Sequence, residues 1–452
     1  MLAALCPTLS GFEDEAGGMD LQNVLAPMIT LSERRAKLWS VVRVSSGNFL
    51  EMYDFMVFGY YASIIGRAFF PSGSAFLSLM LSLTTFGAGF LMRPLGALVL
   101  GAYTDRHGRR AGLLLTLTLM SIGIFTIACT PSYAAIGLLA PLLVVTGRLL
   151  QGFSAGMELG GVSVYLFEIA TPGQKGFYVS WQSGSQQIAV MVAASIGVLL
   201  NSILPPREME QWGWRIPLLL GCVIVPFLFR LRKSLQETDE FAARKHHPTT
   251  LGILRSLKNN WAIILVGTLM VTMSTVSFYM ITAYTPTFGN SVLHLSNADS
   301  LIVVLCVGAS NLFWLPIMGA LSDRIGRRPL LFGCTILMLA SAYPAMLWLA
   351  YDPSFVRLLI VELWLSFLYG SYNGAMVVFL TEIMPPDVRT SGFAIAYSLA
   401  TAIFGGFTPA LSTYLIHVTG NRAVPGLWLS FAAGCGLAAA LLAKTQRPVP
   451  EH

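Results

Sequence analysis

The stretch GAYTDRHGRR stands at residues 101–110, and GALSDRIGRR follows at residues 319–328. Seven of the ten positions are identical, and each copy lies between two long apolar runs. A charge-dense turn that recurs between apolar segments indicates an internal duplication. The two copies therefore mark equivalent positions in two halves of the chain.

Composition indicates a protein that lies in a lipid bilayer. Apolar residues make up 55% of the 452 residues and charged residues only 11%, whereas soluble domains usually carry about 25% charged residues. A helix crosses the bilayer with ~20 apolar residues. We therefore predict an all-α integral membrane protein with twelve transmembrane helices, near residues 44–66, 76–101, 111–130, 136–167, 178–203, 214–231, 261–286, 300–320, 329–350, 355–381, 391–417 and 425–444.

The longest polar stretch divides these twelve runs into six and six. We predict a six-helix bundle at 41–231, a cytoplasmic linker with a short amphipathic helix at 232–260, and a second six-helix bundle at 261–445. Residues 1–40 precede the first run, and we expect this N-terminal extension to be disordered and cytoplasmic. Its first 27 residues lack the basic and apolar regions of a signal peptide.

Basic residues predict the orientation of the helices. If both termini, the linker and the two repeated turns share one side, that side holds 21 of the 28 Lys and Arg residues, and the other side holds five. Cytoplasmic loops carry the excess of Lys and Arg. We therefore expect both termini and both turns in the cytoplasm.

A second pair of segments supports the duplication. The sequence EIATP at 168–172 ends the fourth predicted helix, and EIMPP at 382–386 ends the tenth. Their offset (382 − 168 = 214) nearly matches the offset of Asp105 and Asp323 in the turns (323 − 105 = 218). Parallel repeats of this kind are expected of a two-bundle secondary transporter.

Other classes of protein fit the sequence less well. The net charge of +6 comes from basic residues in short loops, without the aromatic interleaving of a nucleic-acid surface. The six cysteines form no CxxC pair and the six histidines form no ligand cluster, so we expect no metal site and no cofactor. A polytopic membrane enzyme, the distant alternative, would need a nucleophile–base or metal motif. A transporter-like sensor would need a soluble output domain.

The repeated motif G-x-x-x-D-R-x-G-R-R resembles the signature of the major facilitator superfamily. Four further segments resemble its metabolite–proton symporter branch, at residues 46–54, 93–96, 147–156 and 212–217. Four more are similar to bacterial citrate–proton symporters, at residues 157–165, 181–187, 372–376 and 402–406. Leu159 departs from the aromatic residue frequent in the wider branch but matches the citrate type. The resemblance runs from about Val41 to about Leu442.

This resemblance implies a major facilitator fold that imports citrate by proton symport through alternating access. A proton-coupled symporter for tricarballylate or another di- or tricarboxylate is the alternative, and sodium in place of protons stays open. The expected setting is the bacterial cytoplasmic (inner) membrane, the expected state is a monomer, and the expected partners are citrate, protons and lipid.

Arg93 is the first candidate for binding the substrate. It lies twelve residues before Asp105, which places it ~18 Å above the turn, near mid-membrane. A charge there costs about 3 kcal/mol or more and is a functional hypothesis by default. The rigid guanidinium fork matches a carboxylate. The alternative is an ion pair with an acidic side chain of the first helix.

Glu51 and Asp54 are candidates for proton coupling. They lie three residues apart on one face of the first helix, with Asn48 one turn earlier on the same side. Desolvation disfavours the charged form of a carboxyl group, which suits a proton carrier. The alternative is permanent pairing with Arg93 or Arg148.

Glu158 and Arg148 are the remaining charged candidates. Glu158 lies ten residues before Glu168, ~15 Å up the fourth helix, and could bind a proton or pair with an arginine. The resemblance links Arg148 to proton transfer, and a structural pair is the alternative.

Uncharged polar residues predict the rest of a central cavity. Their spacing places them on shared helix faces, where they could hydrogen-bond the carboxylates and hydroxyl of citrate. The alternative is hydrogen bonding between helices, which buried polar groups need in any case. With Asn48 and Arg93, the predicted substrate-binding residues are Gln182, Gln186, Tyr369, Tyr372, Asn373 and Tyr397.

The repeated turn is predicted to form a cytoplasmic gate. The resemblance assigns Asp105 to the end of a helix in the opposite bundle, where the helix dipole favours a carboxylate. The alternative is a purely topological signal from the positive charges. We expect ion pairs between Arg109 and Glu168 and between Arg327 and Glu382, and we add Asp323 and Arg389 to the gating set.

Overall fold

The computed structural model describes residues 41, 48–107, 109–156, 158–233, 250–385 and 389–443. Residues 41–452 make up one compact unit. The predicted disorder of residues 1–40 and most of the predicted linker fall outside the described residues.

The described part of the N-terminal half, residues 48–233, is helical. Residues 48–60 form a first helix that has a turn at Tyr61. The following helices are α2 (Ala62–Phe69), α3 (Ala75–Leu91), α4 (Arg93–His107), α5 (Arg109–Cys129), α6 (Tyr133–Ile136), α7 (Leu139–Ala155), α8 (Glu158–Ile169), α9 (Lys175–Ile203), α10 (Pro206–Glu208), the π-helix η1 (Met209–Gly213) and α11 (Arg215–Lys233).

The described part of the C-terminal half, residues 250–385 and 389–443, is mainly helical as well. Its elements are α13 (Thr250–Asn259), α14 (Trp261–Tyr279), η2 (Met280–Tyr284), α15 (Thr285–Thr287), η3 (Phe288–Val292), α16 (Asn297–Ile325), α17 (Arg327–Tyr351), α18 (Phe355–Ile383), α19 (Arg389–Ala400), η5 (Thr401–Gly405), α20 (Thr408–Thr419) and α21 (Pro425–Leu442). The prediction of an all-α protein is confirmed, since the described ranges contain no strand.

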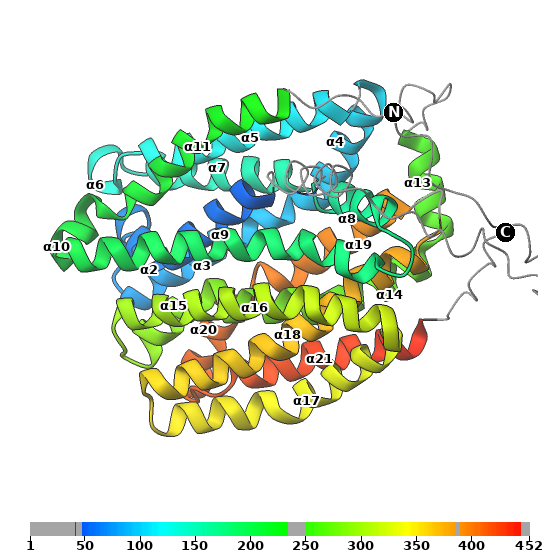
Figure 1. Ribbon diagram of the computed structural model, residues 1–452. Helices are drawn as coiled ribbons and strands as arrows, with labels where there is room; N and C mark the ends of the chain where they lie inside the picture. The colour runs from blue at the N-terminus through cyan, green and yellow to red at the C-terminus, as the bar shows by residue number, and fades with distance from the viewer. Residues whose placement is uncertain are drawn as a thin grey trace, which may run out of the picture. The chain divides into compact units, whose positions relative to one another are not determined.

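The long helices run side by side (Figure 1). Nine helices in the described part of the chain are long and apolar enough to cross a membrane, and a tenth is obtained if residues 206–230, bent by 42°, count as one span. The described residues of the other two predicted spans, near 44–66 and 136–167, are helical except for turns at residues 61, 137–138 and 156.

Large apolar side chains lie on the outside of the protein as well as in its core. Phe125, Leu142 and Phe227 are exposed on the outside, whereas Arg93 and Arg148 are buried. A bilayer solvates apolar groups but offers no partner to polar ones. An outer surface of this kind suits lipid, and the two buried arginines need partners inside the bundle.

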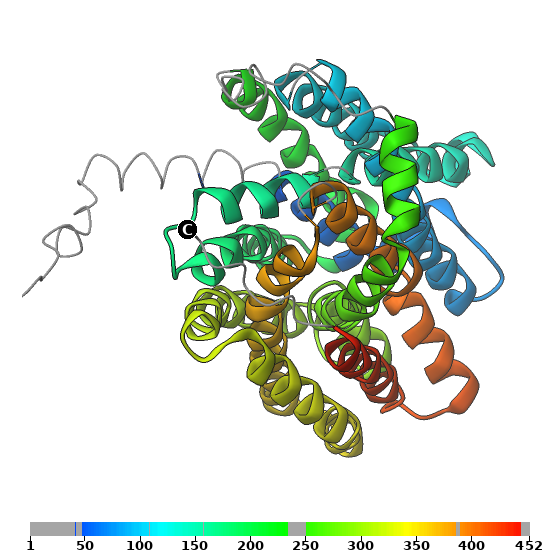
Figure 2. The same cartoon turned by 90° about the vertical axis from the view of Figure 1, so that its right-hand side faces the viewer.

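The two halves meet along several helices. Helix α9 packs against α16 and α18, α3 packs against α20 and η5, and α4 and α8 pack against α19. Figure 2 views these helices nearly along their axes. Glycines permit the closest contact: a Cβ atom on Gly176 would lie 2.3 Å from the carbonyl oxygen of Gly319.

Helix α13 lies at one end of the long helices and crosses their direction (Figures 1 and 2). Leu257 is buried, whereas Arg255 and Lys258 are exposed. This split between an apolar and a charged face agrees with the short amphipathic helix predicted within residues 232–260.

Candidate functional site

Among the described side chains of the N-terminal half, four charged ones are buried, and they form two ion pairs. Glu51, Asp54, Arg93 and Arg148 are each no more than 3% exposed. Arg93 Nη2 donates to Glu51 Oε1, and Arg148 Nη1 lies 3.2 Å from Asp54 Oδ2. A buried charge is tolerated when it is paired and hydrogen-bonded. The structure therefore joins the first helix to α4 through one pair and to α7 through the other.

Aromatic rings enclose both guanidinium groups. The ring of Phe55 lies 5.3 Å from Arg93 Cζ and 4.4 Å from Arg148 Cζ. Phe90 adds a contact of 4.7 Å to Arg93, and Phe58 adds one of 4.5 Å to Arg148. Aromatic faces attract cations most strongly where water is excluded. The rings hold the two arginines in place while leaving their N–H donors available.

Part of each guanidinium has no hydrogen-bond partner among the described residues. These atoms are Arg93 Nε and, in the other pair, Arg148 Nε and Nη2. Unused donors on a buried cation are suited to a second carboxylate. Arg93 thus forms the ion pair with the first helix that was the alternative to substrate binding. It also keeps a free donor with which it could bind an anionic substrate.

Two tyrosines of the C-terminal half, Tyr279 of α14 and Tyr397 of α19, lie near the Arg93–Glu51 pair. The ring of Tyr279 lies 5.1 Å from that of Phe90, the ring that covers the Arg93 guanidinium. The predicted residue Tyr397 thus lies near the charged pairs. Tyr279 was missed, because a tyrosine in an apolar run carries no signal of what it faces.

A chain of hydrogen bonds connects the halves at the predicted polar residues. Asn373 Nδ2 donates to Ser183 Oγ across 2.8 Å, and Ser183 Oγ donates to Gln182 Oε1 across 2.8 Å. Ser274 Oγ completes the chain by donating to Asn373 Oδ1. A second bridge joins Asn311 Nδ2 to Gln187 Oε1 across 3.1 Å. Asn373 of α18 thus contacts α9 directly, and it is connected to Gln182 through Ser183.

The other predicted polar residues are buried at different places. Tyr372 donates to the backbone oxygen of Met270 across 2.9 Å, within its own half. Tyr369 packs against the ring of Phe278 at 5.8 Å, and Gln186 is buried on α9. Both amide atoms of Asn48 are buried without a hydrogen-bond partner in the described part of the chain.

Glu362 is a buried acid that the sequence analysis missed. It lies on α18 and is 1% exposed. No acid inside a predicted span of the C-terminal half was among the predicted site residues. The signal was available, because any ionisable residue inside an apolar run is a functional candidate. Here that run reads FVRLLIVELWLSFLY from residue 355.

The second repeated turn reaches across to the N-terminal half. Asp323 accepts from the backbone N–H groups of Gly176 at 2.8 Å and Phe177 at 3.1 Å, at the first turn of α9. A carboxylate there satisfies free N–H donors and the helix dipole. Arg327 lies 2.6 Å from Asp323 and 3.0 Å from Glu382. Asp323 of the second turn thus makes the contact with a helix end that was expected for Asp105 of the first turn. The expected ion pair between Arg327 and Glu382 is also present.

The first repeated turn is described less fully. The side chains of Asp105, Arg109 and Glu158 lie outside the described residues, so their predicted contacts stay predictions. Glu168 is exposed at the end of α8. Arg389 of the C-terminal half lies with its guanidinium 5.2 Å from the ring of Phe167, which adds a contact between the halves beside the turns.

Substituting Gly176 with Ala is expected to open the face that carries the repeated turns. The added methyl group would lie 2.3 Å from the Gly319 oxygen, and overpacking of this kind typically costs about 1–3 kcal/mol. Thiol labelling of a cysteine placed at buried Ser180 should therefore rise about tenfold. Gly333→Ala is the matched control, because nothing lies within 4 Å of its added atom. Equal labelling in the two variants would contradict this role for the contact.

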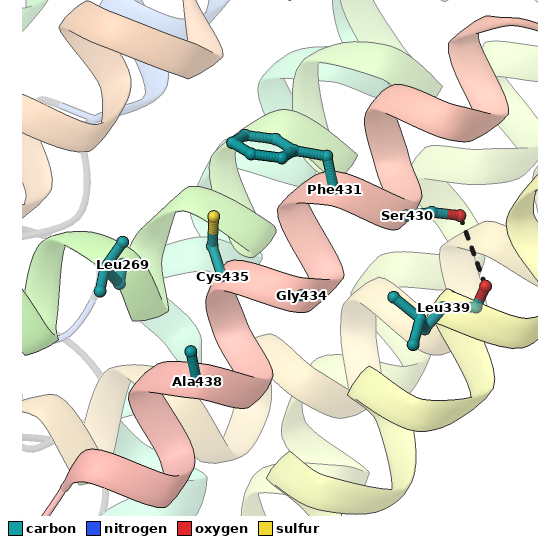
Figure 3. Close-up of a pocket in the computed structure, with 7 residues that line it drawn as sticks. All are labelled: Leu269, Leu339, Ser430, Phe431, Gly434, Cys435 and Ala438. Atoms are coloured by element: carbon teal, nitrogen blue, oxygen red, sulfur yellow. Dashed lines mark hydrogen bonds between the residues drawn. The ribbon is translucent and has the colours of Figure 1, made fainter.

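A groove on the side of the C-terminal half does not suit a charged substrate. It encloses about 520 Å³ between α14, α17 and α21 and is lined mainly by apolar groups, including Leu269, Leu339 and Phe431 (Figure 3). Ser430 is its one hydroxyl, and this group donates to the Leu339 backbone oxygen at 3.4 Å. No charged group lines the groove, so the buried ion pairs remain the candidate site.

Comparisons with known proteins agree on the family. The model of the Major Facilitator Superfamily matches residues 44–401 and 300–452. A citrate-proton symporter of Klebsiella pneumoniae is 60% identical over 404 residues, covering 89% of this chain and 91% of that protein. One of Salmonella typhi is 59% identical over 408 residues, covering 90% and 94%. These relatives are transporters, and they exclude the membrane-enzyme alternative.

Solved structures agree on the fold. The xylose transporter XylE from E. coli, in a partially occluded inward-open conformation, superposes with a TM-score of 0.70 at 18% identity, covering 89% of this chain and 95% of that one. At this identity the match establishes the fold alone. With the family match and the described helices, it confirms the predicted fold: the chain is a multi-pass membrane protein of the major facilitator superfamily.

Proposed function

We propose that this protein imports citrate together with protons by alternating access around the two buried ion pairs. The observation that carries the proposal is the pair of arginines, Arg93 and Arg148, buried within the membrane with unused N–H donors. Citrate carries two to three negative charges near neutral pH, and a guanidinium fork binds a carboxylate with two parallel hydrogen bonds. The named function of the two relatives at 60% and 59% identity supports citrate as the cargo.

In this mechanism the ion pairs exchange partners during transport. A citrate carboxylate that binds Arg93 displaces Glu51, and a proton on Glu51 neutralises the carboxyl group that has lost its arginine. Asp54 takes up a proton in the same way when a citrate carboxylate binds Arg148. The cost of leaving a buried carboxylate without a cation couples the two events. Binding of citrate without a proton, or of a proton without citrate, leaves an uncompensated charge.

The proposed setting follows from the charge distribution and the duplication. Residues 41–231 and 261–445 act as two bundles joined by the linker 232–260, in the bacterial inner membrane, with both termini and the repeated turns in the cytoplasm and the protein a monomer. The contacts of Asp323, Arg327 and Glu382 support a gate on the cytoplasmic face, because they join the halves beside the turns.

Uptake into proteoliposomes tests this function. Labelled citrate should accumulate under an imposed pH gradient, inside alkaline, and an imposed sodium gradient alone should have no effect. Unlabelled citrate should compete with the labelled citrate. Competition by tricarballylate and isocitrate measures the substrate specificity of the site. Stronger competition by tricarballylate than by citrate would favour the alternative cargo, and uptake driven by sodium alone would contradict proton coupling.

A further inference from the structure

Glu362 lies deep in the C-terminal half, near the end opposite the repeated turns. It is seven residues from the start of α18 at Phe355, ~10 Å along the helix, whereas Glu382 beside the turn is at the other end. The carboxyl group is 1% exposed. None of the ion pairs formed by the described residues includes it.

The described residues around Glu362 supply no counter-charge. On α18 itself, Arg357 is directed to Asp352, 3.1 Å away. Three titratable groups lie on the elements that pack against α18. Tyr284 of η2 is hydrogen-bonded to Thr413 at 3.1 Å. Asp299, in the first turn of α16, is itself an acid, and Tyr351 at the end of α17 is exposed. Glu362 is buried, and its side chain forms a hydrogen bond with Thr285. An ionised carboxylate in such a place is strongly disfavoured.

The hydrogen bonding of Thr285 indicates the protonation state independently. Its Oγ1 lies 3.1 Å from Glu362 Oε1 and 3.2 Å from the backbone oxygen of Met280. A threonine hydroxyl has one proton to donate but can accept from another group. If Glu362 is protonated at Oε1, its O–H donates to Thr285 and Thr285 donates to Met280, so that each of these three groups has a partner. The buried Oε2 atom has no hydrogen-bond partner among the described residues. An ionised Glu362 would compete with Met280 for a single proton.

The Glu362–Thr285 contact joins α18 to the irregular segment 280–292, which follows α14. Met280–Tyr284 and Phe288–Val292 are π-helical, and Thr285–Thr287 with Pro286 lies between them. Single π-helical turns occur frequently at functional sites, and proline removes a backbone donor. The segment 280–292 therefore has fewer regular backbone bonds to hold it, and the Glu362–Thr285 contact attaches it to α18.

We propose that Glu362 is a second proton-binding site, which holds its proton while segment 280–292 is closed and releases it when that segment opens. The inference rests on the proposed orientation and proton coupling. In that orientation, segment 280–292 faces the outside of the cell. A proton taken from outside then permits closure behind the bound substrate. Loss of the proton leaves a carboxylate that needs water, and hydration separates Thr285 from Glu362.

The test is labelling of whole cells with a membrane-impermeant maleimide, in a chain whose native cysteines are replaced by serine. The reporter is Thr287→Cys, at a position that is 4% exposed. A separate variant, Ser291→Cys, at an exposed position, corrects for the reagent's own pH dependence. The corrected labelling should rise with external pH by up to about tenfold per pH unit, the limit for one released proton. Glu362→Gln should remove this dependence, and Glu362→Asp should retain it.

These measurements need no citrate, so they stand even if the protein transports another anion. An unchanged pH dependence in Glu362→Gln, or a flat profile in the parent chain, would overturn the proposal. If Glu362→Gln does not reach the membrane, Thr285→Val tests the same contact: it should raise labelling at every pH, whereas Thr285→Ser should behave as the parent. Labelling of Thr285→Val at the parent level would also overturn the proposal.

Discussion

Arg93→Gln is expected to abolish citrate uptake and to weaken citrate binding about 100-fold or more. Truncating one partner of a buried, hydrogen-bonded charge pair costs about 2–5 kcal/mol, and each 1.4 kcal/mol is about a factor of ten in affinity. Arg93 is 1% exposed, in contact with Glu51 and two phenylalanine rings, so no water replaces the lost donor. Binding of labelled citrate to purified protein measures the effect directly.

Two further variants separate substrate binding from charge balance. Arg93→Lys keeps the charge but loses the planar fork, and we expect it to recover only part of the affinity. In the double variant Arg93→Gln/Glu51→Gln no buried charge is left uncompensated at this pair. If the double variant binds citrate normally, Arg93 serves only to neutralise Glu51, and the binding assignment is wrong.

Asp54→Asn is expected to abolish accumulation driven by a pH gradient while leaving exchange of citrate across the membrane. An amide cannot carry the coupled proton, but its oxygen can still accept from Arg148, now 3.2 Å from the Asp54 carboxylate. Arg148 also donates to Gln151 Oε1 at 2.7 Å and contacts three aromatic rings. These contacts hold the arginine where it is, so the site should still bind its cargo.

Net uptake and counterflow in the same proteoliposomes measure this result. Glu51→Gln is the matched comparison, because it removes the other carboxyl group of the same helix face. Loss of both uptake and exchange in Asp54→Asn, with recovery of exchange in Asp54→Asn/Arg148→Gln, would identify a purely structural pair. Full pH-driven uptake in both single variants would place coupling elsewhere, and Glu362 would then be the next residue to replace.

The sequence already contained the landmarks of the fold. The repeated turn identified equivalent positions, and the structure indeed places Asp323 at the first turn of α9 and Arg327 beside Glu382. The helix-end contact was what the family resemblance implied for Asp105, and the repeat carries that expectation to the equivalent position, Asp323. Spans were predictable because the bilayer requires a fixed length of apolar helix.

The pairing inside the site could not be read from spacing. Glu51 and Asp54 share one helix face, so spacing alone cannot say which of them meets Arg93 and which meets Arg148. The choice depends on the rotation and separation of three helices, and packing decides it: Arg93 pairs with Glu51, and Arg148 pairs with Asp54. Gln182 and Asn373 likewise lie 191 residues apart, and only the contact of α9 with α18 connects them through Ser183.

The sequence by itself determined what depends on local patterns: the helices, the duplication, and the burial of charge in the membrane. Only the tertiary structure decided what depends on contacts between distant segments. Tyr279 contacts the Phe90 ring that covers Arg93, and Glu362 meets Thr285 between two π-helical turns, although neither sequence neighbourhood indicates these contacts. The physical reason is that hydrogen bonds and ion pairs act over about 3 Å, a distance fixed by how helices pack rather than by the order of residues within them.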